Sequence, residues 1–492
     1  MWCLSMVKSE LCAFVLRFQI EYIPAAKLTS KALPHNMNKF LIFLASFTLV
    51  NMIDMAQAST TKTASISADQ FIANYSKAYT DLGLGGEMDL SYQKQIQSFL
   101  QSKNLSQQKT FFNHLAQQKT LLEQAHEQAN GISRVSACQT LQLKQIDFEI
   151  ELHQDKLRLI EQVQALGENA ALSDQGLAKS SMGKAWYALL SKAWLTTESK
   201  PEDLMQMGHA ELKRAQQRYR QLQTRMGYAG RDAAFSVYLN SPAFHYEGDS
   251  TPQADYEKRQ AIVIQNLPKL FLPNAIQPPQ IKASILGVAL PVDGYYEPDE
   301  KTFYFNKAKS HYERRNVDWL LLHESMPGHH YQSRYGIEQA ACENQLPHGF
   351  YSAYAEGWGA YVEEFGRELG LFQQDADELG AVEWDLVRSI RVILDVGINY
   401  YDWSEQQAKE FWQNQLPMLP ALADREIKRV RNWPAQAITY KLGAVKFRQL
   451  REAEQKRLGD RFDIRQFHHQ MLRYGPLPIS LLDQLLKLGT PL

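Results

Sequence analysis

The sequence predicts a mainly α-helical fold, a helical bundle with one small antiparallel β element. The first observation is that apolar residues recur at three- and four-residue spacing through most of the 492 residues, as they do in amphipathic helices. The second is that β-branched and aromatic runs are concentrated in one stretch, residues 284–308. The third is a content of 45% hydrophobic and 22% charged side chains, which is typical of a globular protein with a large core.

The segment from Met37 to Ala58 has the pattern of a secretory signal peptide. Lys39 precedes the apolar run LIFLASFTLV, and Ala56-Gln57-Ala58 follows it. We therefore expect cleavage after Ala58 and export, with the periplasm as the destination. Residues 1–36 are then an upstream extension from an early start codon; the alternative is a buried N-terminal helix. Because the apolar run is short for a membrane span and no cysteine follows it closely, we expect no stable membrane anchor after cleavage.

The net charge and the cysteine content limit the expected partners. A formal charge of -1 means that the chain lacks the excess of positive charge with which proteins bind nucleic acid or an anionic membrane, so neither is an expected partner. Once the leader is removed, Cys138 and Cys342 remain. An exported protein can oxidise such a pair to a disulfide, although the sequence leaves open whether the two meet. Two cysteines so far apart do not make a zinc cluster.

Residues 59–190 are predicted to be an N-terminal helical region with a scaffolding role. Four segments repeat apolar residues at helical spacing, and their many glutamines fall where a solvated face is expected. These segments are residues 71–82, 91–102, 109–128 and 140–166.

Residues 191–492 are predicted to be a second region. Its first long helix begins at Pro201, because a proline followed by early acidic residues is typical of a helix start. A turn-rich surface loop is expected at residues 241–256, followed by the strand-forming stretch. From Val317 to about Leu488 the pattern is helical again. Breaks in it are expected near Gly397, Pro417 to Pro420, Pro434 and Gly475 to Pro478.

The stretch LLHESMPGHHYQ, residues 321–332, carries a candidate metal site. A zinc hydrolase needs three protein ligands, one open position and a carboxylate that accepts a proton from water. Two histidines four residues apart on one helix face often supply two of the ligands, but the position four residues after His323 is Pro327. Glu324, next to the first histidine, is the candidate general base.

Proline and glycine after Glu324 offer a way to bring a second histidine back to the first. Pro327 removes a backbone donor and Gly328 tolerates unusual backbone angles, so the pair can bulge or break the helix. The nearer histidine, His329, is then the better candidate ligand, and His330 is the alternative.

A third ligand is sought in AYAEGWGAYVEE, residues 353–364. Glu356 lies in an apolar, helix-compatible stretch, where a carboxylate is costly to bury without a partner. That partner is either a metal cation or an arginine, and spacing alone does not decide between them.

Four successive blocks resemble those of a known family. HESMPGHHYQ, YAEGWGAYVEE, RVILDVGINYYDW and WPAQAITYKLGAVKFRQLR look like blocks of the bacterial domain-of-unknown-function family 885. The resemblance runs from about Trp194 into FDIRQFHHQMLRYGPLPISLL and covers about 290 residues. That family is similar to gluzincin-type zinc peptidases, so the resemblance implies that residues 191–492 are a metallopeptidase-like catalytic region.

The resemblance implies a complete set of site residues. His323, His329 and Glu356 would hold one zinc ion, and Glu324 would be the base. Tyr440, in ITYKLG, matches a tyrosine suited to stabilising the oxyanion of a tetrahedral intermediate. The alternative for Tyr440 is a half-buried core residue.

Further residues are candidates for contacts with the ligands or the substrate. Arg391 and Asp395 match the family and lie four residues apart, as in an ordinary ion pair on one helix face, which we favour. Alternatively, Asp395 holds a histidine ligand in its metal-binding tautomer. The segment from Phe303 to Asn306, just before the site helix, matches an edge strand that binds the substrate backbone. His330 is a candidate by its position.

Three positions depart from the family pattern, which usually has histidine at Asn399, glycine at Ala435 and tyrosine at Val430. Asn399 can donate a hydrogen bond but cannot carry a charge. The departure therefore puts catalytic efficiency in question more than metal binding.

Together these features predict an exported zinc-dependent hydrolase, a peptidase that acts on short peptides through a zinc-bound water in a deep cleft of the bundle. One alternative is a zinc hydrolase of non-peptide amides or esters, because no residue determines the leaving group. The other is a metal-containing but catalytically weak or inactive periplasmic binding protein.

Overall fold

The computed structural model describes residues 67–84, 91–102, 104–128, 136–167, 171–246, 252–284, 293–306, 312–343, 345–347 and 350–488. The expected leader and upstream extension lie outside these residues. Helices dominate the described chain, and the mainly α prediction is confirmed. None of the described helices is both long and apolar enough to span a bilayer.

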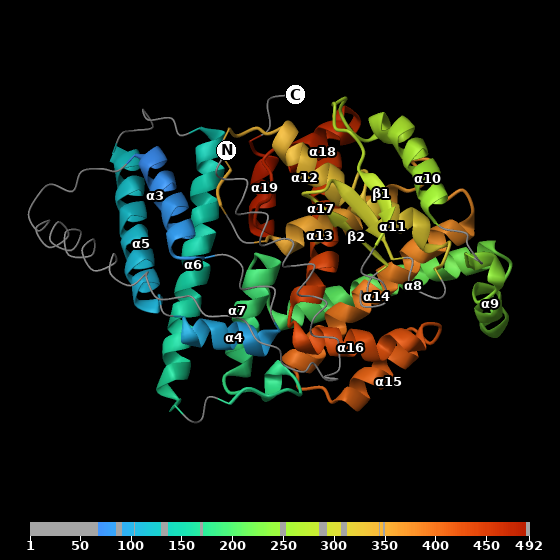
Figure 1. Cartoon of the computed structure of the whole chain (residues 1–492), viewed down its shortest axis with the longest axis horizontal. Coiled ribbons are helices and arrows are strands. Elements are labelled where there is room, and N and C mark those ends of the chain that lie inside the picture. Colours follow the sequence, from blue (N-terminus) through green and yellow to red (C-terminus); the bar gives the residue numbers. More distant parts are fainter. Residues whose placement is uncertain are drawn as a thin grey trace, which may run out of the picture.

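The predicted N-terminal helices are confirmed. They are α3 (Ala68–Asp81), α4 (Tyr92–Gln101), α5 (Leu105–Gln128) and α6 (Ala137–Ala165), and they are followed by α7 (Gly183–Leu195). A capping box at the start of α6, in which Ser136 and Gln139 exchange side-chain and backbone hydrogen bonds, fixes where that helix begins. Helices α3, α5 and α6 lie side by side on one flank of the molecule (Figure 1). Buried apolar side chains such as Phe71, Phe112 and Ile146 form the core between them.

Helix α7 connects this flank to the rest of the molecule. It packs against α6, and its buried residues Trp186 and Leu190 share a core with Val392 and Val396 of the C-terminal half. The boundary expected near residue 190 therefore falls within a helix that has apolar contacts on both sides.

The two remaining cysteines meet. Cys138, at the start of α6, forms a disulfide with Cys342, and their Cα atoms are 5.6 Å apart. The disulfide joins the N-terminal flank to the segment that follows α12.

The middle of the chain contains three helices and the sheet. The helices are α8 (Pro201–Arg225), α9 (Asp232–Leu239) and α10 (Gln253–Asn266), and the strands are β1 (Gln280–Ala283), β2 (Gly294–Glu297) and β3 (Thr302–Phe305). As predicted, α8 begins at its proline. The predicted loop at 241–256 holds a single 3-10 turn, Pro242–Phe244, before α10 begins, although residues 247–251 lie outside the described chain.

The sheet differs from the predicted antiparallel element, because it is mixed and has the order β1-β3-β2. Strands β2 and β3 form the expected antiparallel hairpin, but β1 pairs with β3 in parallel. Strand β1 was not predicted, since its residues QIKA lack a run of β-branched or aromatic side chains. The apolar run at 285–290, expected to contribute a strand, lies outside the described residues.

The C-terminal half is helical, as predicted. Its helices are α11 (Asn316–Glu324), α12 (His329–Glu338), α13 (Ser352–Val362), α14 (Asp375–Asn399), α15 (Glu405–Gln415), α16 (Ala423–Asn432), α17 (Thr439–Leu458), α18 (Ile464–Leu472) and α19 (Leu482–Leu485). The break expected near Gly397 is confirmed, although α14 continues two residues further, to Asn399. A Cβ atom at Gly397 would lie 2.5 Å from the Trp403 ring, so this glycine admits a neighbouring side chain and does not end the helix.

Two long helix pairs surround the candidate site. Helix α14 packs along α8, and α13 packs along α17. The second pair is unusually close, since a Cβ atom at Gly357 would lie 2.4 Å from the Cα of Gly443. Helices α11, α12 and α13 lie beside the sheet in the same part of the molecule (Figure 1).

Candidate metal centre

The predicted helix break is confirmed. Helix α11 ends at Glu324 and α12 begins at His329, with a cis peptide bond between Met326 and Pro327. Gly328 permits the tight turn, because a Cβ atom there would lie 1.9 Å from the carbonyl oxygen of His323. The indole Nε1 of Trp358, in α13, donates a hydrogen bond to the Pro327 carbonyl at 2.8 Å and holds the turn in place.

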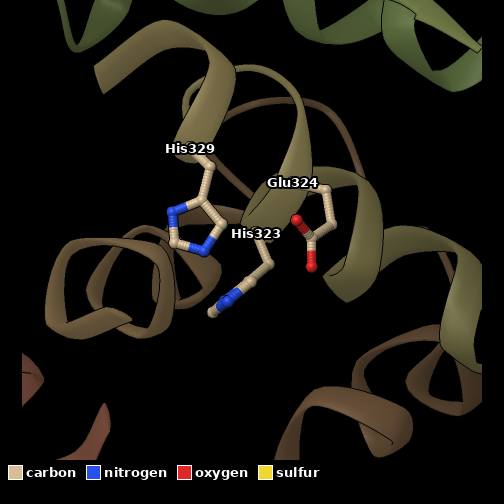
Figure 2. A group of neighbouring side chains, drawn as sticks. All are labelled: His323, Glu324 and His329. Atoms are coloured by element: carbon tan, nitrogen blue, oxygen red, sulfur yellow. The ribbon is translucent and has the colours of Figure 1, made fainter. Parts of the chain in front are cut away.

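The turn brings His323, Glu324 and His329 together. One ligand atom from each lies within 4.8 Å of the others, and Figure 2 shows their side chains extending into the same space from the ends of two helices. The ring centroids of the two histidines are 4.6 Å apart.

Glu356 completes the group of predicted ligands. Its Oε2 atom is 3.3 Å from Nε2 of His323 and 3.3 Å from Nε2 of His329. Two imidazole nitrogens and one carboxylate oxygen that converge in this way are a donor set suited to a catalytic zinc ion, with Glu324 alongside. The arrangement does not depend on an arginine partner for Glu356, since both contacts are to histidines.

His330 faces away from this group. Its Nε2 donates to the carbonyl of Gln277 at 2.7 Å, and its Nδ1 accepts from the hydroxyl of Tyr296 at 3.0 Å. Burial lowers the pKa of His330 to about 4, so the ring stays neutral in this environment. Of the two adjacent histidines, His329 is therefore the one placed to bind a metal.

Gly359 makes room for the first histidine. A Cβ atom at this position of α13 would lie 2.6 Å from Cε1 of His323, which is closer than atoms of this kind can approach. The glycine in AEGWG thus allows α13 to carry Glu356 close to the imidazole.

A residue that the sequence analysis missed holds His323 in position. Glu363 Oε1 accepts a hydrogen bond from Nδ1 of His323 at 2.7 Å. Arg388 binds both oxygens of the same carboxylate, at 2.6 and 2.8 Å. A carboxylate behind a ligand histidine fixes its tautomer and raises its basicity. Glu363 lies seven residues after Glu356, about two helical turns, and this spacing was an available signal.

The charges around the site shift the pKa values of His323, Glu324 and Glu356. Burial opposes a charge on His323, but hydrogen bonds to Glu356 and Glu363 outweigh it and raise the pKa to about 10. The pKa of Glu356 is lowered, because burial is outweighed by hydrogen bonds with both histidines. Burial raises the pKa of Glu324, although the charge of His329 and the Tyr296 backbone N–H oppose the rise. The pKa values of the two carboxylates are therefore shifted in opposite directions.

Tyr440 lies directly against the predicted ligands. Its ring stacks on that of His323, with centroids 6.2 Å apart and an interplanar angle of 21°. Nη2 of Arg429 donates to its hydroxyl oxygen at 3.3 Å, which leaves the hydroxyl proton available to another acceptor. Burial raises the pKa of Tyr440, with a further contribution from Glu356, so the hydroxyl keeps its proton.

The predicted ion pair between Arg391 and Asp395 is wrong. Nε of Arg391 donates to Glu426 at 2.6 Å. Asp395 instead accepts from the hydroxyl of Tyr187 at 3.0 Å and from the backbone N–H of Ala435 at 2.9 Å. The alternative, in which Asp395 holds a ligand histidine, is also wrong, because Glu363 has that position. Ala435 has a φ of 67°, in the left-handed region that favours glycine, which accounts for the family's glycine here.

Asn399 and Asn306 have structural partners. The Asn399 amide donates to the Val430 carbonyl at 2.8 Å and accepts from the Leu177 backbone N–H at 3.3 Å. It is fully buried and belongs to the packing between helices. Asn306 is also fully buried, and its backbone N–H donates to the Asp293 carbonyl at 2.8 Å.

The predicted edge strand at Phe303 to Asn306 is wrong, because β3 is the central strand of the sheet. Among the described residues, β2 is an edge strand of the sheet, and it contacts α11. The bond between Asn306 N–H and the Asp293 carbonyl places alternate residues of β2 in hydrogen-bonded pairs with β3. The main-chain groups of Gly294 and Tyr296 therefore point outward, and the Tyr296 N–H reaches the carboxylate of Glu324.

A small pocket lies next to the candidate metal centre. Glu363, Arg388 and Tyr440 line it, but His323, Glu324, His329 and Glu356 do not. It therefore lies next to the predicted ligands and is not the expected cleft around them.

Comparisons with known proteins give a family and a fold. The family described as bacterial protein of unknown function (DUF885) matches residues 68–486, so the match includes the N-terminal helices as well as the region from Trp194 onward. No functionally curated protein matched the chain.

Solved structures of two bacterial proteins are among those that resemble it. One is of a "putative lipoprotein" from Colwellia psychrerythraea, with 23% identity, a TM-score of 0.58 and coverage of 85% of this chain and 73% of that one. The other is of a "putative lipoprotein of unknown function" from Shewanella oneidensis, with 16% identity, a TM-score of 0.51 and coverage of 89% and 91%. At these identities the likeness establishes a shared fold. With a family match over most of its length, the chain belongs to the bacterial protein family DUF885.

Proposed function

We propose that this protein is a zinc-dependent hydrolase that cleaves short peptides. The observation that carries the proposal is the convergence of His323, His329 and Glu356, with Oε2 of the glutamate 3.3 Å from each histidine Nε2. Two histidines and a carboxylate leave one position of a tetrahedral zinc ion open for water or substrate. When bound, the zinc ion would supply Lewis acidity to a carbonyl oxygen and acidify a water molecule.

The residues around that position have complementary roles in the proposed reaction. Glu324, which lies beside the two histidines, would accept a proton from the attacking water. The hydroxyl of Tyr440 donates to the oxygen that becomes negative, because its own oxygen already accepts from Arg429. Glu363 and Arg388 hold the His323 ring in a fixed orientation.

The edge strand β2 supports a peptide as the substrate. Main-chain groups of Gly294 and Tyr296 point away from β3, and the Tyr296 N–H contacts Glu324. An extended peptide that pairs with this edge would present its backbone carbonyls along the metal centre. Esters and small amides lack a backbone that can use such an edge, which favours the peptide.

Export is part of the proposal. It is supported by the leader pattern at Met37 to Ala58, by the disulfide between Cys138 and Cys342 and by the descriptions of both similar structures as lipoproteins. Disulfides persist in oxidising compartments such as the periplasm.

Zinc analysis combined with digestion of a peptide mixture tests the proposal. The purified protein should hold one zinc ion per chain and cleave peptides in a way that a chelator abolishes. Glu324→Gln should retain the zinc and lose at least about 100-fold in cleavage rate, because the base is removed and the ligands are kept. The matched control is Glu338→Gln, an exposed glutamate of α12, which should change neither quantity.

Two results would count against this function. A protein that binds zinc and cleaves none of the peptides would favour the binding-protein alternative. A protein that takes up no zinc when it is supplied would refute the assignment of the ligands.

A further inference from the structure

Two arginines beside Tyr440 have unused hydrogen-bond donors. Arg391, in α14, is 2% exposed and donates through Nε to Glu426, and among the described residues neither of its terminal nitrogens has an acceptor. Arg429, in α16, donates through Nη2 to Gln436 at 3.0 Å and to Tyr440 at 3.3 Å. Within the part of the chain that the structure describes, Arg429 forms no ion pair with a carboxylate.

Three guanidinium groups surround Tyr440, and the charge of Glu356, which also acts on it, is held between two histidines. The guanidinium carbons of Arg388, Arg391 and Arg429 lie 5.7, 5.7 and 5.6 Å from the centroid of the Tyr440 ring. Among the described carboxylates, one pairs with Arg388 and one with Arg391. The second of these, Glu426, is shared with Arg425 at 2.8 Å, so it does not offset Arg391 alone.

Like charges in a buried setting are unfavourable unless an anion is present. The cost of charging Arg391 is reflected in its pKa, which is lowered by burial and, in part, by the charge of Arg429. The two guanidinium groups thus lie close enough to influence each other, and both approach the same tyrosine. A planar anion with two oxygens is the group that such a pair of donors binds best.

We propose that Arg391 and Arg429 bind the free C-terminal carboxylate of the peptide substrate, so that the enzyme removes residues from the C-terminal end. The inference rests on the proposed hydrolase function and specifies its substrate. Tyr440 connects the two sites, since its ring stacks on His323 and its hydroxyl contacts Arg429. A terminal carboxylate lies one or two residues from the bond that is cleaved, at roughly 3.8 Å per residue, and Tyr440 is the side chain that lies between the arginines and His323.

The reaction is a hydrolysis that needs no further reactant. The oxygen of water forms a bond to the carbonyl carbon while the C–N bond breaks, and the leaving nitrogen takes up a proton. The products are a shortened peptide with a new terminal carboxylate and a free amino acid or dipeptide. The released fragment keeps the carboxylate that the two arginines held.

Paired libraries of peptides test this inference on the zinc-loaded full-length protein. One library contains N-acetylated tripeptides with every C-terminal residue as the free acid, and the other contains the same peptides as C-terminal amides. The wild type should cleave the acids at least tenfold faster, expressed as kcat/KM. Arg429→Met should lower kcat/KM for the acids by about 100-fold and for the amides by no more than threefold, whereas Arg429→Lys should fall between.

Arg431→Met is the matched control, because this arginine lies in the same helix and pairs with Glu405 at 3.0 Å. This substitution should leave kcat/KM unchanged for both libraries. Binding is measured separately by equilibrium dialysis of N-acetyl amino acids and their amides, followed by mass spectrometry. The wild type should retain the acids in preference to the amides, and Arg429→Met should not.

The outcomes separate this inference from the proposed function. Equal cleavage of acids and amides by the wild type, unchanged in Arg429→Met, would overturn the inference and leave the hydrolase standing. Selective retention of acids without any cleavage would support the carboxylate site and refute the hydrolase. Preference for amides that carry an Asp or Glu side chain would overturn the assignment to the terminal carboxylate. Neither cleavage nor retention would overturn both.

Discussion

The N-terminal flank and the candidate metal centre are both well-packed helical regions, yet the pKa values of their buried carboxylates are shifted in opposite directions. In the flank, α3, α5 and α6 bury rings and aliphatic side chains, and the buried carboxylate of Glu149 has the neutral hydroxyl of Tyr351 as a close donor, at 2.6 Å. Burial raises the pKa of Glu149 to about 7. In the metal centre, Glu356 lies between two histidines and its pKa is lowered.

The contrast fits a scaffold in the first region and a functional site, as proposed above, in the second. A scaffold gains from apolar contacts and keeps the few charges inside it uncharged or paired. The candidate metal centre instead brings carboxylates, imidazoles and guanidinium groups together, as is common in functional sites. Substitutions in the two regions should therefore have different signatures.

The largest expected effect is in the flank. Phe112→Ala removes a fully buried ring that stacks on His153 with centroids 4.5 Å apart. We expect a loss of about 3–5 kcal/mol in the free energy of unfolding, measured by denaturant titration, with no change in zinc affinity of the protein that remains folded. Gln117→Ala, at an exposed position of the same helix, should change stability by less than about 0.5 kcal/mol. A fall in zinc affinity that matches the fall in stability would show that the two regions are not independent.

Much of this flank was predictable from the sequence, because helical periodicity is a local property. The four predicted segments correspond to α3 to α6 with small shifts at their ends. The break between Glu324 and His329 was also predictable, since Pro327 and Gly328 act on the backbone directly.

What could not be predicted depends on contacts between distant segments. The central position of β3 follows from its pairing with β1, which carries no strong strand signal. Arg391 and Asp395 lie four residues apart, but the partners of each come from other elements, Glu426 and Ala435. The seven-residue spacing between Glu356 and Glu363 was a signal in the sequence, but the contacts of Glu363 with Arg388 and His323 join segments that are distant in the chain.

A smaller effect should appear in the pH dependence of stability. The folded protein keeps the proton of Glu149 up to about pH 7, whereas the unfolded chain releases it near 4.5. The stability that this carboxyl contributes is therefore complete below pH 4.5 and is lost as the pH rises to 7. Glu149→Gln should remove this loss, so that its stability relative to the wild type is about 2–3 kcal/mol greater at pH 7.5 than at pH 4.5.

Denaturant titrations of both proteins at the two pH values measure this difference. Because other groups titrate equally in both proteins, only the difference between them reports on Glu149. The same difference at both pH values would mean that the carboxyl is ionised in the folded state, as Glu356 is in the metal centre.

The smallest effect concerns the residue behind the first histidine. Glu363→Gln keeps a hydrogen-bond acceptor for Nδ1 of His323 but removes the charge that pairs with Arg388. We expect zinc affinity to fall by about 10- to 100-fold, because the carboxylate no longer raises the basicity of the ligand. Competition with a zinc-binding dye measures the affinity. Glu364→Gln is the matched control, since the neighbouring Glu364 pairs with Arg448 at 3.3 Å and does not touch a histidine. Equal zinc affinities for the two variants would mean that Glu363 forms only a structural ion pair with Arg388 and does not support a zinc ligand.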